Sequence, residues 1–500
     1  MAGALSTNIK QFALKRPVLL VVLVFIISIL FRLPQLTRPL SKHFELNTAF
    51  VLISTDVWQK EGFRLSHAAP VHTYRGEYNV PAGLYEGPFT QLVISGAYLS
   101  FGPGSYWLPY FYFNTFHVSP SAAGIRIFNL LLQLISVILI YQLALAFCKD
   151  KQVAITTGII AIFCPVAMWF QGNAYCHEVA IIPMYLGMLL LLYHIWNAKQ
   201  PGIARYAGFA ALLYVAVLTD WLALFLCFVV LCLQVKQKIQ KGTLNRILIA
   251  IISLVPLLAT GTILYIYNNV VGSTELMGFI KATFFHRSVW GDVPSSATNN
   301  FLNIFIYLFA GYGFVIPVIA IALFNREVRT FLLRTHPVLI ITAIAPVLHY
   351  IVFYNFANEH DYAALKWIAL FPLAAAYGIH TLWRTKPVTR QLLILSCIFL
   401  NGFIYQWINF PGQTTRKAER YDWQETTGHA IIQNVAPDEY IFTNQQLTSS
   451  VLNWYAKRES ILVTDSAEAQ KMFHRLKGTK AAYIEMTGFT ITHIVHLAKQ

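Results

Sequence analysis

The stretch AAGIRIFNLLLQLISVILIYQLALAFCKDKQVAITTGIIAIFCPVAMWFQ, residues 122–171, decides the fold. It contains two apolar segments, 122–147 and 152–171, which are separated by the basic residues Lys149 and Lys151. A helix needs about 20 apolar residues to cross the hydrocarbon core of a membrane, and both segments reach that length. Lysines between two such segments are typical of a connection on the cytoplasmic side. The stretch therefore predicts two membrane-spanning helices joined at the cytoplasmic face.

The same pattern recurs along the chain. Hydrophobic residues make up 56% of the sequence and charged residues only 12%, about half the charged share of a soluble domain. The predicted fold class is therefore an α-helical polytopic membrane protein with about 11 spans. Two of these, the fifth and sixth, are short and can form one tight hairpin around Thr219-Asp220-Trp221. The predicted spans are 17–35, 122–147, 152–171, 178–196, 206–220, 221–235, 247–268, 301–324, 337–356, 363–383 and 391–408.

The charges of the connections predict the orientation. If the N-terminus lies in the cytoplasm, the cytoplasmic connections carry seventeen basic residues, whereas the short outer connections carry only Lys281 and Arg287. This imbalance predicts an N-in, C-out, multi-pass protein of the plasma membrane, the inner membrane of a bacterium. The first span lacks a small-residue cleavage site and is predicted to stay uncleaved. The net charge of +15 is not gathered into one patch, which argues against a nucleic-acid partner. The seventeen residues are Lys10, Lys15, Arg16, Lys149, Lys151, Lys199, Arg205, Lys236, Lys238, Lys241, Arg246, Arg326, Arg329, Arg334, Arg384, Lys386 and Arg390.

Two regions are predicted to lie outside the cytoplasm. The first belongs to the transmembrane domain, 1–408, and is a long first outer loop, 33–121. It contains amphipathic, helix-like stretches at 45–61 and 89–101 and an aromatic run, 106–116, which suits the membrane interface. These stretches predict helices that lie at the membrane surface.

The second region, 409–500, has an ordinary soluble composition. Helix-like and strand-like segments alternate in it, which predicts a small α/β domain on the outer side. It contains no glycine-rich nucleotide-binding loop and no cysteine. The predicted elements are helix 423–434, strand 439–443, helix 447–456, strand 460–464, helix 466–477 and strand 481–486.

Candidate acids stand in the first outer loop. Glu45 follows closely after the first helix emerges, and Asp56 lies eleven residues later, about three helical turns on and on nearly the same face. Taken alone, Glu45 also fits an acid at a helix N-terminus that complements the helix dipole. The loop therefore offers two carboxylates near the outer surface.

Candidate cations stand at three other outer positions. The segment 358–362 holds His360, Asp361 and Tyr362, and Lys366 follows one turn inside the tenth span, where a charge is costly and usually faces a cavity. Lys281 and Arg287 lie before the eighth span, and Arg126 begins the second. Such cations suit a phosphate-bearing ligand, although each alone can equally anchor lipid head groups.

Other polar residues have structural interpretations. Asp220 fits a plain turn former. Cys176-His177-Glu178 lacks a second pair of ligands, so no metal site is predicted there. The six cysteines show no metal-binding spacing, and no disulfide framework is expected.

Together these features resemble the C-superfamily of membrane glycosyltransferases (GT-C), which includes the protein O-mannosyltransferases and the aminoarabinose transferases of lipid A. In that family the large first outer loop carries an acidic residue close to its start, and the second helix opens with an arginine-containing pattern. The matching residues are Arg32-Leu33-Pro34, Arg38-Pro39-Leu40, His43-Phe44-Glu45, Ala49, Gly87-Pro88-Phe89, Leu99–Gly102, Gly124–Phe128, Pro165, Trp169-Phe170, Asn173, His177-Glu178, His360-Asp361-Tyr362 and Leu370-Phe371-Pro372.

The resemblance implies an enzyme that passes a sugar from a polyprenyl-phosphate carrier in the bilayer to a glycan, lipid or protein acceptor outside the cytoplasm. Glu45 would then be the general base that deprotonates the acceptor hydroxyl, with inversion at the anomeric carbon and Asp56 as a second catalytic candidate. Cations would stabilise the departing phosphate. The phosphate-binding candidates are Arg287, Lys281, His360, Lys366 and Arg126, and the further site candidates are His43, Glu86, Asp361 and Tyr362.

No cofactor is required by the resemblance, but some family members use a divalent metal ion. Oxygen ligands for such an ion are available from Glu45, Asp56 and Glu86. Glu86 occupies a position where the family usually has proline or lysine, in the sequence Glu86-Gly87-Pro88. This departure makes the donor assignment less specific.

The main alternative is a transporter or flippase of lipid-linked saccharides. Such a protein should place ionisable residues at mid-bilayer, whereas this sequence concentrates them at the outer edge. A polysaccharide polymerase or ligase would share the lipid donor but would be expected to carry its largest outer loop later in the chain. A non-catalytic structural protein is the third alternative.

Overall fold

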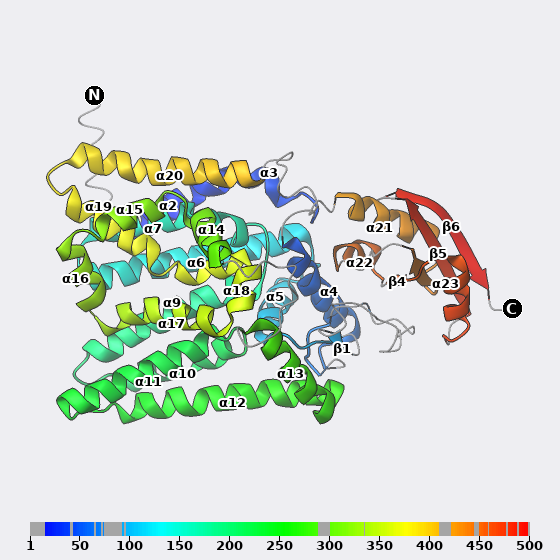
Figure 1. Ribbon diagram of the computed structural model, residues 1–500, viewed down its shortest axis with the longest axis horizontal. Coiled ribbons are helices and arrows are strands. Elements are labelled where there is room, and N and C mark those ends of the chain that lie inside the picture. Colours follow the sequence, from blue (N-terminus) through cyan, green and yellow to red (C-terminus); the bar gives the residue numbers. More distant parts are fainter. Residues whose placement is uncertain are drawn as a thin grey trace.

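The computed structural model shows a helical body with a small α/β domain at one end (Figure 1). In the figure, long helices run side by side across the body, with α20 along one edge and α12 along the other. The elements α4 and α5 lie at the end that adjoins the α/β domain. The residues that the structure describes are 16–40, 44–64, 67–71, 74, 93–94, 97–288, 301–334, 336–409, 422–444, 450–458, 460–476, 479–487 and 490–498.

Helices cover all eleven predicted apolar segments. In the described part of the chain, five helices are long and apolar enough to cross a membrane. Three bent helix pairs are further candidates, and three other apolar helices are shorter. These features identify a polytopic membrane protein. The helices are α2 (Pro17–Leu30), α3 (Leu33–Leu36), α6 (Ala122–Cys148), α7 (Lys151–Phe163), α8 (Pro165–Phe170), α9 (His177–Asn197), α10 (Ile203–Val217), α11 (Leu222–Lys241), α12 (Arg246–Val271), α13 (Ser273–Arg287), α14 (Phe301–Tyr312), α15 (Val315–Ala322), α16 (Arg326–Arg334), α17 (Pro337–Val352), α18 (Tyr354–Glu359), η2 (Asp361–Trp367), α19 (Phe371–Leu382) and α20 (Pro387–Asn409).

Five predicted spans are interrupted rather than continuous among the described residues, and two of these are 17–35, divided between α2 and α3, and 337–356, divided between α17 and α18. The segment 152–171 breaks at Cys164, whose extended backbone precedes Pro165 at the first position of α8. The segment 301–324 bends by 103° between α14 and α15, where Gly313 has a positive φ of 51°. The segment 363–383 begins as the 3-10 helix η2 and bends by 53° before α19. Apolar composition alone does not reveal such breaks.

The burial pattern fits a lipid-facing surface. On α6, Ile127, Leu131 and Ile135 are 42–47% exposed, whereas the opposite face of the same helix is buried. Helix α9 is central, with 61% of its most apolar window buried, against 17% for the peripheral helices α12 and α20. Large apolar side chains on peripheral helices are stable in lipid but costly in water.

The segment 33–121, predicted as the first outer loop, is only partly helical in its described residues. The stretch 45–61 forms α4 (Glu45–Glu61), and the aromatic run lies in α5 (Gly104–Thr115). The helix predicted over 89–101 is wrong where the structure describes it, since Val93–Ile94 (β1) and Ala97–Tyr98 (β2) pair as antiparallel strands. Valine and isoleucine favour the extended backbone, which local amphipathic spacing did not reveal.

Residues 422–498 contain a four-stranded sheet in the order β4-β3-β5-β6. Strand β3 pairs in parallel with β4 and β5, and β6, which was not predicted, pairs antiparallel with β5. Two apolar clusters pack helices against this sheet. One contains residues of α21 and α22, and the other contains residues of α23. The elements are α21 (Asp422–Asn434), β3 (Tyr440–Thr443), α22 (Ser450–Ala456), β4 (Ser460–Leu462), α23 (Ser466–Phe473), β5 (Lys480–Thr487) and β6 (Thr490–Ala498).

The α/β domain contacts the segment between α2 and α5 through the end of α22. The backbone N–H of Leu40 donates to the Tyr455 hydroxyl at 2.7 Å. Lys457 Nζ lies 3.3 Å from Asp56 Oδ2 and 3.1 Å from the hydroxyl of Tyr74. Nearby cations lower the pKa of Asp56 despite its partial burial, so this carboxylate is ionised at neutral pH. The contact joins α22 to the helix that begins with Glu45.

Candidate active site

Glu45 is the first residue of α4 and is completely buried. Its two oxygens accept hydrogen bonds from both terminal nitrogens of Arg38, each at 2.7 Å. Oε1 also accepts from Arg126 Nη2 at 2.9 Å. A bidentate guanidinium–carboxylate pair is among the strongest hydrogen-bonded ion pairs in proteins. The carboxylate is therefore fixed between two arginines.

Arg126 connects Glu45 to the backbone that leads into α4. Its guanidinium donates to the carbonyl oxygens of Leu36 at 3.0 Å and Pro39 at 3.2 Å, and also to the carbonyl of Arg38. The sequence predicted both Glu45 and Arg126 as site residues, and the structure brings them together. Two guanidinium groups thus face one carboxylate among the described residues.

A second buried centre contains residues from three parts of the chain. Glu178 Oε1 lies 2.8 Å from His177 Nε2 and 3.0 Å from Lys366 Nζ. Asp220 Oδ2 lies 3.5 Å from each of the same two nitrogens. All four side chains are at most 5% exposed. Two carboxylates thus share one ammonium group inside the body.

The structural interpretations of Asp220 and Glu178 were incomplete. Asp220 does form a turn, because its Oδ1 accepts from the N–H of Leu222 at 2.7 Å, but its other oxygen faces Lys366. The sequence carried one usable signal, since three acidic or basic side chains stand at the ends of apolar segments where desolvation is costly. Their mutual contact depends on packing and was not predictable from spacing.

The second centre has donor atoms that suit a divalent cation. One ligand atom each from His177, Glu178 and Asp220 lies within 4.8 Å of the others, and this is the only such group among the described residues. A nitrogen with two carboxylate oxygens fits zinc or a similar ion. Lys366 Nζ, however, already provides a positive charge between the two carboxylates. Glu45 and Asp56, predicted as possible ligands, are instead paired with arginine and lysine.

Arg287 lies next to the second centre but does not contact its carboxylates. Its guanidinium carbon is 3.9 Å from the centre of the Phe101 ring, and that ring stacks on His177 at 3.4 Å. Arg287 also donates to the carbonyl of Ser100 at 2.8 Å. Lys281, from the same helix, is exposed. Of these two predicted cations, only Arg287 joins the site.

An aromatic wall connects the start of α4 to the 358–362 segment. The ring of Phe44 stacks on His360 at 5.6 Å and meets Tyr362 edge-on at 4.9 Å. His360 Nδ1 lies 2.9 Å from the carbonyl of Phe356. Burial lowers the pKa of His360 to about 4, so this predicted phosphate-binding residue is neutral at pH 7. Because Nδ1 donates its proton to the Phe356 carbonyl, the neutral ring can only accept a hydrogen bond at Nε2, and it offers a phosphate neither a donor nor a charge.

Acidification should destabilise the protein through His360. Between pH 6.5 and 4 the unfolded chain protonates this histidine and the folded protein does not, so stability falls as the pH falls. We expect a loss of about 2 kcal/mol between pH 7 and pH 5 from this group. His360→Phe should flatten that part of the pH profile in unfolding measurements on detergent-solubilised protein. The same substitution at exposed His474 should leave the profile unchanged, and an equal profile for both variants would contradict the assignment.

The remaining predicted residues are separate from these centres or lie outside the described part of the chain. Asp56 stands about 16 Å along α4 from Glu45 and contacts Lys60, Tyr74 and Lys457. Asp361 is partly exposed in the first turn of η2. His43 and Glu86 lie outside the described residues.

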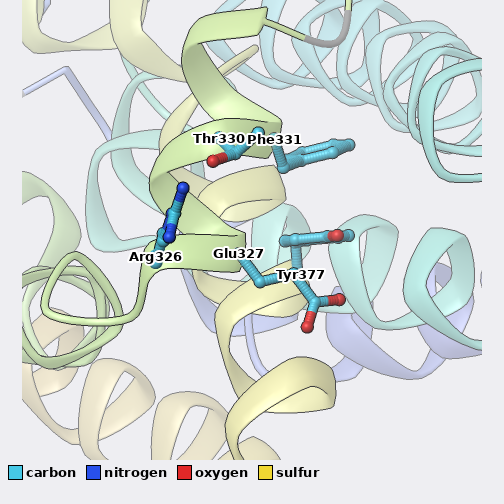
Figure 2. A pocket seen from close by; sticks show the side chains of 5 residues that line it. All are labelled: Arg326, Glu327, Thr330, Phe331 and Tyr377. Atoms are coloured by element: carbon cyan, nitrogen blue, oxygen red, sulfur yellow. The ribbon is translucent and has the colours of Figure 1, made fainter.

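A surface hollow of about 410 Å³ is lined by residues of α16 and α19 (Figure 2). Figure 2 shows that Phe331 of α16 and Tyr377 of α19 form its aromatic side, and these rings stack at 3.7 Å. Helix α16 lies at the opposite end of the body from α4 (Figure 1). None of the predicted site residues lines this hollow.

Comparison with solved structures shows a shared fold over nearly the whole chain. ArnT from Cupriavidus metallidurans, bound to undecaprenyl phosphate, matches with a TM-score of 0.64 and 13% identity over 94% of this chain and 92% of its own. The oligosaccharyltransferase AglB from Archaeoglobus fulgidus, in complex with an inhibitory peptide and a dolichol-phosphate, matches with a TM-score of 0.61 and 11% identity, over 94% of this chain and 70% of its own. Both are GT-C glycosyltransferases, so the predicted resemblance is confirmed at the level of the fold. No protein-family model and no curated protein matches the sequence.

Proposed function

We propose that this chain, which has the fold of GT-C glycosyltransferases, transfers a sugar from a polyprenyl-phosphate carrier to an acceptor hydroxyl outside the cytoplasm. One observation carries the proposal: Glu45, at the start of the first outer loop, is a buried carboxylate between two arginines. A base and cations for a phosphate leaving group therefore lie within one centre. The neighbours bound to undecaprenyl phosphate and dolichol-phosphate support the choice of donor class.

Glu45 is a weak base while both arginines hold it, because each opposite charge favours the ionised carboxylate. The two partners differ in exposure, since the Arg38 side chain is 14% exposed and that of Arg126 is fully buried. In the proposed mechanism, the donor phosphate draws Arg38 away from Glu45. The carboxylate then loses one of its ion pairs and becomes more basic when the donor is bound.

The reaction is a single displacement. Glu45 takes the proton of the acceptor hydroxyl while the acceptor oxygen attacks the anomeric carbon, and the bond from that carbon to the phosphate oxygen breaks. The configuration inverts because attack and departure occur on opposite faces. Arg38 balances the charge that develops on the polyprenyl phosphate. Arg126 positions Glu45, and Arg287 is the partly exposed cation that can reach a ligand from the α13 side.

The test is transfer by purified full-length protein with a panel of radiolabelled polyprenyl-phosphate sugars. Glu45→Gln should reduce transfer about 100-fold or more, the usual contribution of a general base. Glu275→Gln changes an exposed acid in the first turn of α13 in the same way and should retain activity. Melting temperatures of both variants separate a chemical loss from a folding defect.

Equal transfer by wild-type and Glu45→Gln protein would remove Glu45 from the reaction. Movement of intact lipid-linked sugar across proteoliposome membranes, without transfer to any acceptor, would instead support the alternative of a transporter or flippase.

A further inference from the structure

A line of buried polar side chains runs along α6, away from Glu45 and into the body. Arg126, Asn129, Gln133 and Ser136 are spaced by three, four and three residues, which places them on one face of the helix. All four are at most 1% exposed. The opposite face of α6 carries the exposed apolar residues described above, so the polar line faces protein rather than lipid. Buried polar groups in a spanning helix usually serve a ligand or a polar partner.

Arg32, which follows α2, reaches this line. The side chain is 3% exposed, and its guanidinium donates to Gln133 Oε1 and, at 3.3 Å, to Ser28 Oγ. Both partners are neutral. Among the described residues, no carboxylate forms an ion pair with Arg32. A buried charge without a counter-ion is costly, so a bound anion would stabilise this guanidinium.

Three buried donors without partners among the described residues belong to Arg32, to its partner Gln133 and to Trp169, which stands three residues before Gly172. Arg32 Nε, Gln133 Nε2 and Trp169 Nε1 are buried and lack a hydrogen-bond partner in the described part of the chain. The orientation of the Gln133 amide is fixed, because its oxygen already accepts from Arg32. Unpaired buried donors in a native fold usually mark a bound water, ion or ligand. A guanidinium group and an amide donor in contact with each other suit a ligand that only accepts hydrogen bonds, as phosphate oxygens do.

The end of α8 packs closely against Arg32, and the three donor atoms are buried. Gly172 follows the turn after Trp169, and a Cβ atom there would lie 3.4 Å from Arg32 Nη1 and overlap the carbonyl oxygen of Met168. Arg38 lies over the Trp169 ring, with its guanidinium carbon 5.7 Å from the ring centre. Arg38 therefore borders both Glu45 and the Trp169 donor.

We propose that Arg32, Gln133 and Trp169 form an oxyanion subsite that holds the phosphate of a polyprenyl-phosphate lipid. We call this set the Arg32 subsite. The inference rests on the proposed function, and it adds residues that were not among the sequence-predicted phosphate contacts. It also explains how the Arg38 side chain could leave Glu45 in the proposed mechanism, because a phosphate held beside Trp169 would lie next to its guanidinium. Asn129 Oδ1, a buried acceptor without a partner among the described residues, is available for a sugar hydroxyl.

A lipid phosphate is favoured over a free phosphate by the position of Arg32. It follows directly on α2, where Ile26, Ile27, Leu30 and Phe31 are 51–61% exposed to the surroundings. An isoprenoid chain lying against these side chains would bring its phosphate to the end of α2. Inorganic phosphate has no chain to use that apolar surface.

The test measures binding to full-length protein by native mass spectrometry, with undecaprenyl phosphate, undecaprenol and inorganic phosphate as probes. Trp169→Phe keeps the ring and removes one donor, and it should weaken undecaprenyl phosphate binding about tenfold. Arg32→Gln should weaken it about 100-fold, and Arg32→Lys should recover part of the loss. Neither change should alter undecaprenol binding.

Two matched controls are present in the chain. Trp367 is another indole with a buried N–H, and Trp367→Phe should bind the lipid phosphate normally. Arg384, which is 68% exposed, provides an Arg→Gln control. Because Trp169→Phe is a mild change, it keeps the test valid even if Arg32→Gln folds poorly.

Wild-type affinity in both Trp169→Phe and Arg32→Gln would overturn the inference. Binding of inorganic phosphate with the same dependence on Arg32 would overturn the lipid assignment. The two proposals can fail separately: transfer that needs Glu45 but not Arg32 would refute only the subsite. Arg32-dependent binding of the lipid by a protein that transfers no sugar would refute only the enzyme.

Discussion

Replacing Lys366 with Met is expected to lower the free energy of unfolding by about 3–5 kcal/mol. The ammonium lies 3.0 Å from Glu178 and 3.5 Å from Asp220, and all three side chains are at most 1% exposed. Without Lys366, two carboxylates remain in a site that excludes water, and both lose the ammonium group that lies within 3.5 Å of them. Unfolding in mixed micelles titrated with sodium dodecyl sulfate measures the loss.

The assignment can be separated from simple loss of packing by a second substitution. Adding Glu178→Gln to Lys366→Met removes one of the stranded negative charges and should restore a large part of the stability. Lys281→Met, a change of the same kind at an exposed lysine, should have little effect. A double variant as unstable as Lys366→Met would contradict the proposed charge balance.

Arg126→Met should also destabilise the protein by about 3–5 kcal/mol and should reduce transfer. The substitution removes one ion pair of Glu45 and leaves the carbonyl oxygens of Leu36 and Pro39 without their donor. Arg126→Lys keeps the charge but cannot reproduce the planar set of donors, so it should recover only part of the loss. The measurements are the same unfolding titration and the transfer assay with the radiolabelled donors.

Arg384 provides the comparison for this prediction. It pairs with Glu327 at 2.9 Å, but the two side chains are 68% and 51% exposed, so Arg384→Met should cost at most about 1 kcal/mol. If Arg126→Met were as mild as Arg384→Met, the buried pair with Glu45 would not be a structural centre.

The sequence by itself determined the membrane environment, the helical segments and the start of α4. A span needs about 20 apolar residues to cross the hydrocarbon core, and a run of this kind can be recognised from local composition alone. The same locality explains why Glu45 and Arg126 were found, since each stands where a helix meets the first outer loop. The errors at 89–101 and at the interrupted spans are also local, since β1 pairs with the nearby β2 and two of the breaks fall beside Pro165 and Gly313, but apolar spacing does not reveal them.

Only the tertiary structure decided which charges meet. Lys366 is 188 residues from Glu178, and Arg32 is 101 residues from Gln133, yet each pair is in hydrogen-bond contact. No local pattern predicts these pairs, because any one of the residues could have turned to another face of its helix at little local cost. Packing fixes the choice: inside the body a charge must find a partner or a ligand, and the fold determines which one lies within reach.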